Sequence, residues 1–355
     1  MTRPSMPAQQ HGSVETRPLA GARGWVIADD KIGMQVQVKG VADALGLDYE
    51  LKQVAPRGLT RLLAPWARPR RAERIGKPGS LLEPPWPAIA LATGRLAIPY
   101  ILAVRRLAGP DTFTVILQDP KTSANSADLI WVPEHDRRRG ANVISTVTAP
   151  HSFSPKRLAG LRAAVPPAIA ALPHPRVAVV LGGANGIYTF DDESLKRLGA
   201  SLEALAGSGA AFMITPSRRS PPQLVATVEA ATRSAPRILW DGSGPNPYPD
   251  FLAHADALIV TADSVNMTGE ACATGRPVYV FAPKGGSEKF DRFHAALRAL
   301  GATRPLPDRL MALEAWTYVA IDSAGLIAAE IERRWLRRKA LLPKGWPGRA
   351  GSSAR

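Results

Sequence analysis

One carboxylate stands apart in the stretch VTADSVNMTGEACATGRPVYVF, residues 260–281. Its neighbours in the helix that this stretch predicts are apolar, small or neutral polar, yet Glu270 falls in the second turn of that helix. Ser264 is placed to cap the helix, but a capping box would need an acidic residue where the chain has Met267. A carboxylate at position 270 can accept two hydrogen bonds from a vicinal diol such as a ribose. A solvated helix residue is the open alternative.

Glycines follow an apolar segment in LGGANGIYTFDDESL, residues 181–195. Gly182, Gly183 and Gly186 would let the backbone approach a ligand and would present N–H groups to an anion, with Asn185 in the same turn. A plain tight turn also uses glycine, so a short glycine cluster leaves both interpretations open.

Hydroxyl and guanidinium groups gather in MITPSRRSP, residues 213–221. Arginine can bind two phosphate oxygens at once, so a diphosphate is the ligand expected for such a turn. A solvated basic loop is the alternative, above all for Arg219. The predicted nucleotide-sugar site comprises the residues of these three turns: Gly182, Gly183, Asn185, Thr215, Ser217, Arg218, Asp263, Ser264, Met267 and Glu270.

Short apolar segments alternate with helix-length segments along the chain, which predicts βαβ units and parallel sheets. In such sheets the ligand crevice lies beyond the carboxyl ends of the strands, where the three turns fall. The predicted strands of a first domain are 24–30, 47–55, 88–94, 112–119, 128–134 and 142–148, and those of a second are 176–183, 210–217, 237–242, 257–263 and 277–283. Predicted helices include 35–46, which ends on Gly46, and 191–207.

The length of 355 residues suits two domains. We predict a disordered lead-in (1–20), a first domain (21–170), a second domain (171–320) and a C-terminal helix with a basic tail (321–355), with the boundary in the proline-rich stretch 163–175. A single cysteine and no Cys/His cluster of zinc-ligand spacing indicate a reducing cytoplasm and predict no metal site.

The net charge of +15 is concentrated in two Trp-containing basic segments, 56–77 and 333–346. Their mixture of arginine, tryptophan and leucine suits an anionic membrane surface. A solvated arginine-rich surface is the open alternative. No nucleic-acid-binding motif is present, so we expect no nucleic-acid partner. The apolar run 86–104 is broken by Arg95 and prolines and predicts a buried strand and helix rather than a membrane span.

The stretch 261–281 resembles the nucleotide-binding element of GT-B glycosyltransferases, in which a glutamate near the start of a helix holds the ribose of a nucleotide-sugar. More narrowly, the chain resembles the ELM family, the mitochondrial-fission-factor-like proteins of plants and many bacteria. The resemblance runs in order from Trp25 to Pro305 and rests on four segments: 29–46, 118–144, 181–190 with 213–221, and the stretch around Glu270.

This resemblance implies an α/β, GT-B-like fold of two Rossmann-like domains whose parallel sheets face a central cleft. It also implies a C-terminal helix that returns towards the first domain. The expected function is transfer of a sugar from a nucleoside-diphosphate-sugar substrate, without a cofactor, at the cytoplasmic membrane face. One alternative is a non-catalytic scaffold that recruits a protein partner to a membrane. A weaker one is a nucleotide-sugar epimerase, for which the expected GxGxxG turn and Tyr-x-x-x-Lys pair are missing.

The first turn of the chain departs from the family, whose members often have Gly followed by His where this chain has Gly33 and Met34. A thioether cannot act as a general base, so that role must fall elsewhere. Asp30, Asp119 and His135 are the predicted catalytic residues; Asp29, Asp136 and His151 are further candidates, and for all of them a structural hydrogen bond or cap is the open alternative.

Overall fold

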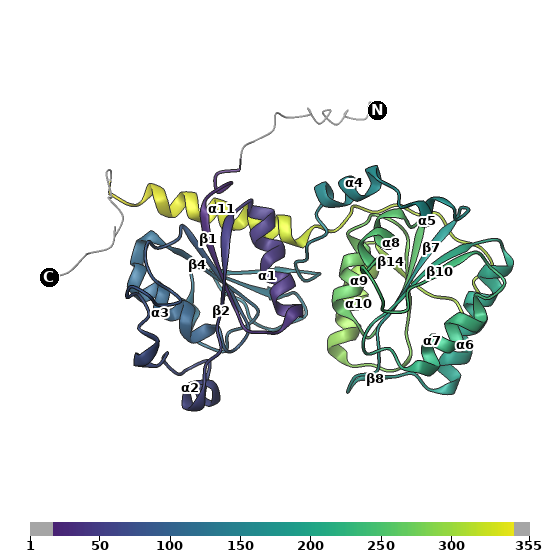
Figure 1. Ribbon diagram of the computed structural model, residues 1–355, viewed down its shortest axis with the longest axis horizontal. Coiled ribbons are helices and arrows are strands. Elements are labelled where there is room, and N and C mark those ends of the chain that lie inside the picture. Colours follow the sequence, from purple (N-terminus) through teal and green to yellow (C-terminus); the bar gives the residue numbers. More distant parts are fainter. Residues whose placement is uncertain (1–16, 344–355) are drawn as a thin grey trace, which may run out of the picture.

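The computed structural model describes residues 17–343 and shows two six-stranded sheets, each in its own domain (Figure 1). Every strand pair within both sheets is parallel. This confirms the predicted α/β, GT-B-like class of two Rossmann-like domains. The first sheet has β1 (Arg23–Ala28), β2 (Asp48–Gln53), β3 (Ile89–Thr93), β4 (Phe113–Leu117), β5 (Leu129–Pro133) and β6 (Val143–Thr146).

The second sheet has β7 (Arg176–Leu181), β9 (Ala211–Pro216), β10 (Arg237–Leu239), β11 (Ala257–Thr261), β12 (Val278–Phe281) and β14 (Thr303–Pro305). A two-stranded antiparallel ribbon pairs β8 (Tyr188–Thr189) with β13 (Lys284–Gly285). Each predicted strand overlaps an observed one, whereas the three short strands β8, β13 and β14 were not predicted.

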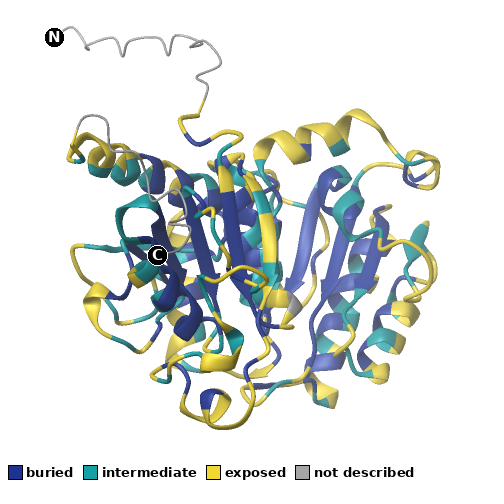
Figure 2. Ribbon diagram, turned by 60° about the vertical axis from the view of Figure 1, so that its left-hand side comes forward, coloured by how far each residue is buried: buried dark blue, intermediate teal, exposed yellow. Residues whose placement is uncertain are grey.

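The central strands are continuous apolar runs because helices cover both faces of each sheet. The six residues of β7, for example, are all buried, whereas β2 is an edge strand whose charged residues are mostly exposed. Figure 2 shows buried strands in the middle of each domain and exposed residues on the outer helices and turns.

The helices begin and end where local chemistry dictates. Helix α1 (Ile32–Leu45) ends at Gly46, which takes the left-handed conformation at φ 68°, and α6 (Asp192–Gly207) begins after Asp191, whose carboxylate accepts from Ser194 N–H. The other helices are α2 (Gly58–Leu63), α3 (Ile98–Ala108), α4 (Pro155–Ala163), α5 (Pro167–Ala170), α7 (Pro222–Ala231), α8 (Tyr248–His254), α9 (Val265–Cys272), α10 (Glu288–Ala299) and α11 (Ser323–Ala340).

Strand order places one switch point in each sheet. The second sheet runs β10-β9-β7-β11-β12-β14, which is the 3-2-1-4-5-6 order of dinucleotide-binding folds, and it reverses between β7 and β11. The first sheet runs β2-β1-β3-β4-β5-β6 and reverses between β1 and β3. Ligands of open parallel sheets bind beyond the carboxyl ends of strands at such points.

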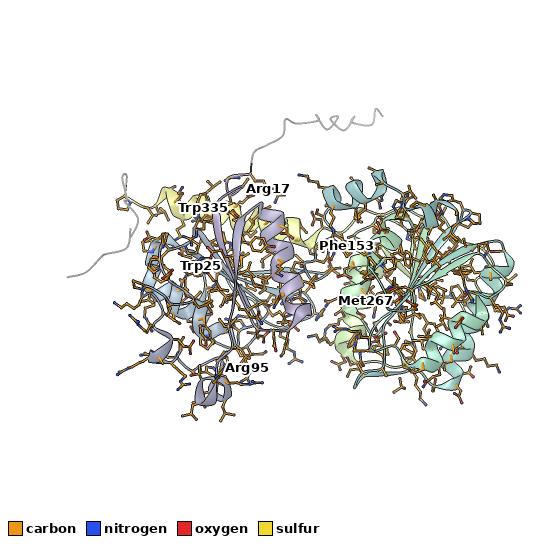
Figure 3. The ribbon with its side chains drawn as sticks, viewed as in Figure 1. Arg17, Trp25, Arg95, Phe153, Met267 and Trp335 are labelled. Atoms are coloured by element: carbon orange, nitrogen blue, oxygen red, sulfur yellow. The ribbon has the colours of Figure 1, made fainter. Side chains whose placement is uncertain are left out.

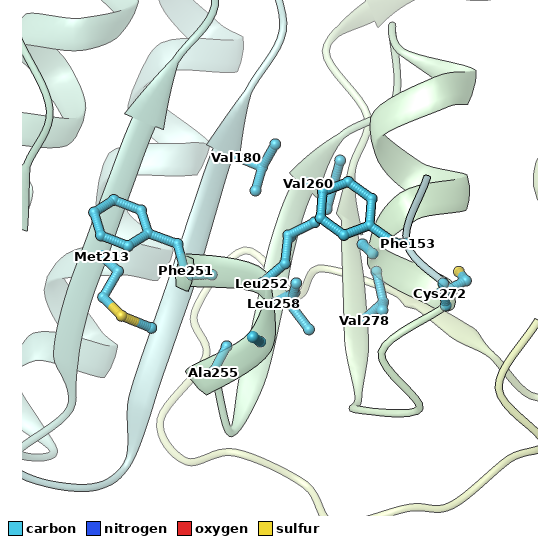
Figure 4. Packing of buried hydrophobic residues seen from close by; sticks show 14 of the residues in the cluster. Phe153, Val180, Met213, Phe251, Leu252, Ala255, Leu258, Val260, Cys272 and Val278 are labelled. Carbon is cyan, nitrogen blue, oxygen red and sulfur yellow. The ribbon is translucent and has the colours of Figure 1, made fainter. Parts of the chain in front are cut away.

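The chain passes between the domains twice. After β6 it enters the core of the second domain at Phe153, which lies beside Val260 and is followed there by Leu158 and Ile169 (Figure 4). It returns through α11, whose Ile327 packs in the core of the first domain beside α1. The four predicted boundaries stay predictions, and residues 1–16 of the lead-in and 344–355 of the basic tail lie outside the described residues.

None of the helices between residues 17 and 343 combines the length and the apolar composition that a membrane crossing requires.

Candidate functional site

The second switch point is closed by hydrogen bonds within the chain. The N–H of Gly182 donates to Thr261 Oγ1 at 2.8 Å, and the N–H of Gly183 donates to Asp263 Oδ2 at 2.8 Å. We expected these N–H groups to face an anion, but in this structure they are already used. Assignment of both glycines to a ligand stays a prediction.

Close packing explains why these positions are glycine. A Cβ at Gly182 would lie 2.2 Å from Asp263 Oδ2, and one at Gly183 would lie 2.0 Å from the carbonyl oxygen of Arg219. Gly186 in the same loop has nothing within 4 Å of that position. The first two glycines therefore let three turns meet at the end of β7.

Asp263 is a buried carboxylate at the centre of this contact. Its Oδ2 accepts from Gly183, whereas its Oδ1 has no hydrogen-bond partner among the described residues. The guanidinium of Arg219 lies 3.8 Å from Oδ2. Burial raises the pKa of Asp263, against hydrogen bonds from Thr261 and Gly183 that favour the charged form.

In the neighbouring turns, the side chains of the predicted site form hydrogen bonds with the loops themselves. Asn185 donates to the Asp263 carbonyl at 3.3 Å and accepts from the N–H groups of Ile187 and Tyr188. Ser217 Oγ accepts from Arg219 N–H and lies 3.2 Å from Ser220 Oγ.

Two further residues of the predicted nucleotide-sugar site lie at and just after the end of β9. Thr215 is buried within the strand, whereas Arg218 is exposed and makes no ion pair with any described residue. Of the predicted phosphate-binding side chains in this turn, Arg218 is thus the one that is free to bind.

Helix α9 begins at this switch point and positions Glu270. Ser264 Oγ accepts from Met267 N–H at 3.4 Å, as predicted for the cap, and Met267 packs against the core. Tyr248 of α8 donates its hydroxyl hydrogen to Glu270 Oε2 at 2.5 Å. Burial raises the pKa of Glu270 to about 7, although the Tyr248 hydrogen bond and the charge of Arg157 act in the opposite direction.

Glu270 lines a pocket of about 90 Å³ between the two domains. Gly33 and Gln37 of α1 form one wall, and Asn266 and Glu270 of α9 form the facing wall. His151, in the segment that links the domains, completes the lining. This pocket is part of the expected central cleft.

His151 is buried in that cleft with its Nδ1 accepting from Phe153 N–H at 3.3 Å. Its Nε2 makes no hydrogen bond among the described residues. Burial lowers the pKa of His151 to about 4, with the charge of Asp322 and the carbonyl of Gly269 acting against it. The ring is therefore neutral at physiological pH.

The predicted catalytic residues of the first domain have different surroundings. Asp30 is exposed in the turn after β1. His135 packs edge-on against Phe293 of α10 at 5.8 Å, and burial lowers its pKa. Asp119 pairs with Lys121 and Arg138, each at 2.8 Å.

Asp119 is a poor base because of these partners. Burial alone would raise its pKa, but hydrogen bonds from Lys121 and Arg138 outweigh that effect and lower the pKa to about 2. A carboxylate with so low a pKa accepts a proton weakly at neutral pH. The catalytic roles of all three residues stay predictions.

Polar groups not singled out in the sequence connect the domains. Gln37 donates to Asn266 Oδ1 at 3.4 Å and accepts from Gln118, whose amide also reaches Met34 Sδ at 3.3 Å. Tyr248 was likewise missed. Because these side chains are far apart in the sequence, no local pattern indicates them.

A larger cavity of about 480 Å³ lies at the first switch point. Gly94 and Asp119 line it at the carboxyl ends of β3 and β4, and Met34, Leu62 and Trp66 form further walls. The cavity at the first switch point is thus larger than the pocket beside Glu270, the residue predicted to bind the ribose.

The family model described as Mitochondrial fission ELM1 matches residues 32–335. The Mitochondrial fission protein ELM1 of Arabidopsis thaliana is 29% identical over 284 residues, covering 73% of this chain and 65% of that protein. An uncharacterized protein of Rickettsia prowazekii is 31% identical over 161 residues, covering 44% of this chain and 45% of its own length. The chain therefore spans less than two thirds of each of these relatives.

Solved structures align loosely with the whole chain. The UDP-GlcNAc 2-epimerase of Methanocaldococcus jannaschii gives a TM-score of 0.47 at 9% identity, covering 88% of this chain and 99% of that one. The glycosyltransferase SnogD of Streptomyces nogalater gives 0.47 at 13% identity, covering 90% and 96%. MurG of Acinetobacter baumannii gives 0.45 at 13% identity, covering 91% and 96%. The fold assignment rests on the strand order of the two sheets.

Proposed function

This chain belongs to the Mitochondrial fission ELM1 family, and from that premise we propose that it is a GT-B-type transferase that moves a sugar from a nucleoside-diphosphate sugar to an acceptor at the cytoplasmic membrane face. The observation that carries the proposal is the position of Glu270. Its carboxylate lies on the helix that begins at the switch point of a sheet with dinucleotide-binding strand order, and it faces the interdomain pocket.

Glu270 would hold the ribose. A carboxylate accepts hydrogen bonds from both hydroxyls of a vicinal diol, and Tyr248 fixes its orientation through Oε2. Because burial raises the pKa of Glu270 to about 7, it would bind a diol best above that pH, when it is ionised.

The diphosphate would bind at the N-terminus of α9 and at Arg218. Ser264 occupies the N–H of Met267 only, and the first turn of a helix presents further N–H groups to an anion. The exposed Arg218 would neutralise charge on the leaving diphosphate. The Gly182 and Gly183 N–H groups would become available only if Thr261 and Asp263 released them.

A group that contacts the acceptor is needed on that side of the cleft, and His151 lines the same pocket as Glu270. Its Nε2 is without a hydrogen-bond partner among the described residues. Because Nδ1 accepts from Phe153 N–H and the ring is neutral, the ring hydrogen is on Nε2, so His151 would donate a hydrogen bond to the acceptor and would not take its proton.

Ligand binding tests the proposal. Saturating UDP or a UDP-sugar should raise the melting temperature by several degrees, since about 100 times Kd stabilises a protein by about 2.7 kcal/mol. Glu270→Gln should abolish the shift while the protein stays folded. The matched control is Glu203→Gln, an exposed glutamate on α6, which should keep the full shift.

A scaffold that recruits a protein partner is the second candidate function. The volume of about 90 Å³ beside Glu270 favours it, because ligand pockets usually measure about 300–1,000 Å³. If no nucleoside diphosphate or its sugar shifts the melting temperature of the folded protein, the transferase proposal fails and the scaffold is supported.

A further inference from the structure

Helix α2 turns an apolar stripe towards solvent. The stripe comprises Leu59, Leu62 and Leu63, at the i, i+3 and i+4 spacing of an amphipathic helix, and Trp66, which lies three residues beyond the end of α2. The exposed fractions of these four side chains are 74%, 71%, 52% and 73%. Thr60, on the opposite side, is buried. A surface helix normally buries its apolar stripe, so this arrangement is the reverse of the usual one.

The exposure is built into the structure by specific contacts. Arg95 Nη1 donates to the carbonyls of Ala64 at 2.7 Å and Leu62 at 3.3 Å at the end of α2, and Figure 3 labels Arg95 beside this helix. Trp66 Nε1 donates to the Lys121 carbonyl at 3.2 Å. The stripe is therefore held outward on a segment that projects from the first domain (Figure 1).

Free cations border the stripe. Arg57, Arg61 and Arg68 are exposed, and none of them makes an ion pair with a described residue. Leucines flanked by unpaired arginines are complementary to a lipid bilayer, because the leucines can contact the acyl chains while the arginines contact the phosphates of the head groups.

The other basic segment differs in this respect. On α11, Arg333 and Arg334 pair with Glu330, Arg338 pairs with Asp128 at 2.7 Å, and Lys339 lies over the Trp335 ring at 4.4 Å. These cations hold the helix itself and its contact with the first domain. Among the described residues, α2 is the better docking element.

The cavity at the first switch point opens beside the stripe. Leu62 and Trp66 belong to both, because each is mostly exposed and also lines the cavity. Lys31 and Lys121 lie on the same lining. Because the Lys121 ammonium is already paired with Asp119 at 2.8 Å, a phosphate would bind at Lys31, and it would leave its attached apolar chain at the stripe.

We infer that residues 57–68 dock the protein on an anionic phospholipid bilayer, with the α2 stripe among the acyl chains and the three arginines at lipid phosphates, and that the adjoining cavity receives the phosphate-bearing head of an amphiphilic acceptor. The docking stands on the α2 geometry alone, and the acceptor role rests on the proposed function. A bilayer fits better than RNA, because the exposed stripe is mainly aliphatic and offers one aromatic ring for base stacking.

Sedimentation with vesicles tests the docking. The protein should bind vesicles of phosphatidylcholine with phosphatidylglycerol at low and physiological salt, and should bind phosphatidylcholine alone far more weakly. Leu59→Ser with Leu62→Ser should weaken binding roughly tenfold or more, since two exposed leucines lose their transfer into the bilayer. Arg57→Glu with Arg61→Glu should remove the preference for anionic vesicles.

Matched controls make the outcome decisive. Met311→Ser with Leu326→Ser removes two comparably exposed apolar residues elsewhere (63% and 61%) and should leave vesicle binding unchanged. Equal binding by parent and Leu59/Leu62 variant, or no binding by the parent at either salt, overturns the inference. So does competition by inorganic phosphate or by RNA that abolishes vesicle binding at physiological salt.

Failure of the two proposals can be told apart. Glu270→Gln should still bind vesicles, because Glu270 lies in the cleft and not on α2. Vesicle binding without any nucleotide shift would remove the transferase and with it the acceptor role, whereas a nucleotide shift without vesicle binding would remove the docking alone.

Discussion

The two sheets share parallel topology but end differently at their switch points. In the first domain, β1 and β3 end beside a cavity of about 480 Å³, and a Cβ at Gly94 would meet the Asp29 carboxylate at an ordinary 3.5 Å. In the second, Gly182 and Gly183 bring the loop after β7 directly onto Asp263 and Arg219. Strand order sets where a crevice can form, and the residues after each strand decide whether it is open.

The carboxylates at the carboxyl ends of the two sheets also differ in their electrostatic surroundings. Asp119 in the first domain is paired with two cations. In the second domain Asp263 is buried, with an Oδ1 that has no hydrogen-bond partner among the described residues, and the half-buried Glu270 accepts from the Tyr248 hydroxyl. The same residue type is therefore held charged at one edge and biased towards its neutral form at the other.

The largest effect on stability should come from adding a methyl group at the switch point of the second sheet, where the loops are in direct contact. Gly183→Ala should lower the free energy of unfolding by about 3 kcal/mol or more, because its Cβ would meet a backbone oxygen at 2.0 Å. Gly94→Ala should cost about 1–2 kcal/mol, from its φ of +88° alone. Gly186→Ala, in the same loop as Gly183, should be nearly neutral. Urea denaturation gives all three values, and equal costs at Gly183 and Gly94 would remove the contrast.

The pH dependence should have opposite signs at the two edges. Burial raises the pKa of Glu270 from 4.5 to about 7, so its unfolded form loses the proton first and stability falls as pH rises through that window. Glu270→Gln should therefore gain about 2 kcal/mol relative to the parent between pH 4.5 and pH 8. A difference that stays constant with pH would show that Glu270 does not titrate in this window.

Asp119 should behave in the reverse way. Its pKa is lowered from 3.8 to about 2, so its contribution to stability is present above pH 3.8 and is lost as pH falls to about 2. Asp119→Asn should cost about 1 kcal/mol at pH 7 and almost nothing near pH 2. Denaturant unfolding at the two pH values measures this, and a cost that persists at low pH would point to lost packing instead.

The smallest contrast concerns the helices that begin at each edge. Ser264→Ala should cost about 1 kcal/mol because Ser264 caps α9, whereas Lys31→Ala should cost almost nothing because Lys31 makes no side-chain cap on α1. Lys31→Ser should stabilise the protein by a few tenths of a kcal/mol if the new hydroxyl reaches the free N–H groups. Thermal unfolding of the three variants provides the comparison.

Much of the fold could be predicted because its signals are local. A few consecutive residues are enough to predict the apolar strand β7, the end of helix α1 at Gly46 and the cap of α9 at Ser264. All three are observed. The short strand β14 was missed because its residues, Thr303–Pro305, carry no apolar run and pair only through their neighbour β12.

The site was harder because its contacts join distant parts of the chain. Sequence indicated Glu270 but not Tyr248, its partner 22 positions away, nor the contact of Gln37 with Asn266. It also could not show that Thr261 and Asp263 take the glycine N–H groups, because that depends on how closely two loops approach.

The two connections between the domains are fastened to each other. Thr148, in the segment after β6, and Ser323, at the start of α11, join their buried hydroxyls at 2.6 Å, and Gly269 of α9 approaches Thr148 so closely that a Cβ would lie 3.0 Å from it. A rotation of one domain against the other would have to keep or break this hydrogen bond, which lies beside the helix that bears Glu270.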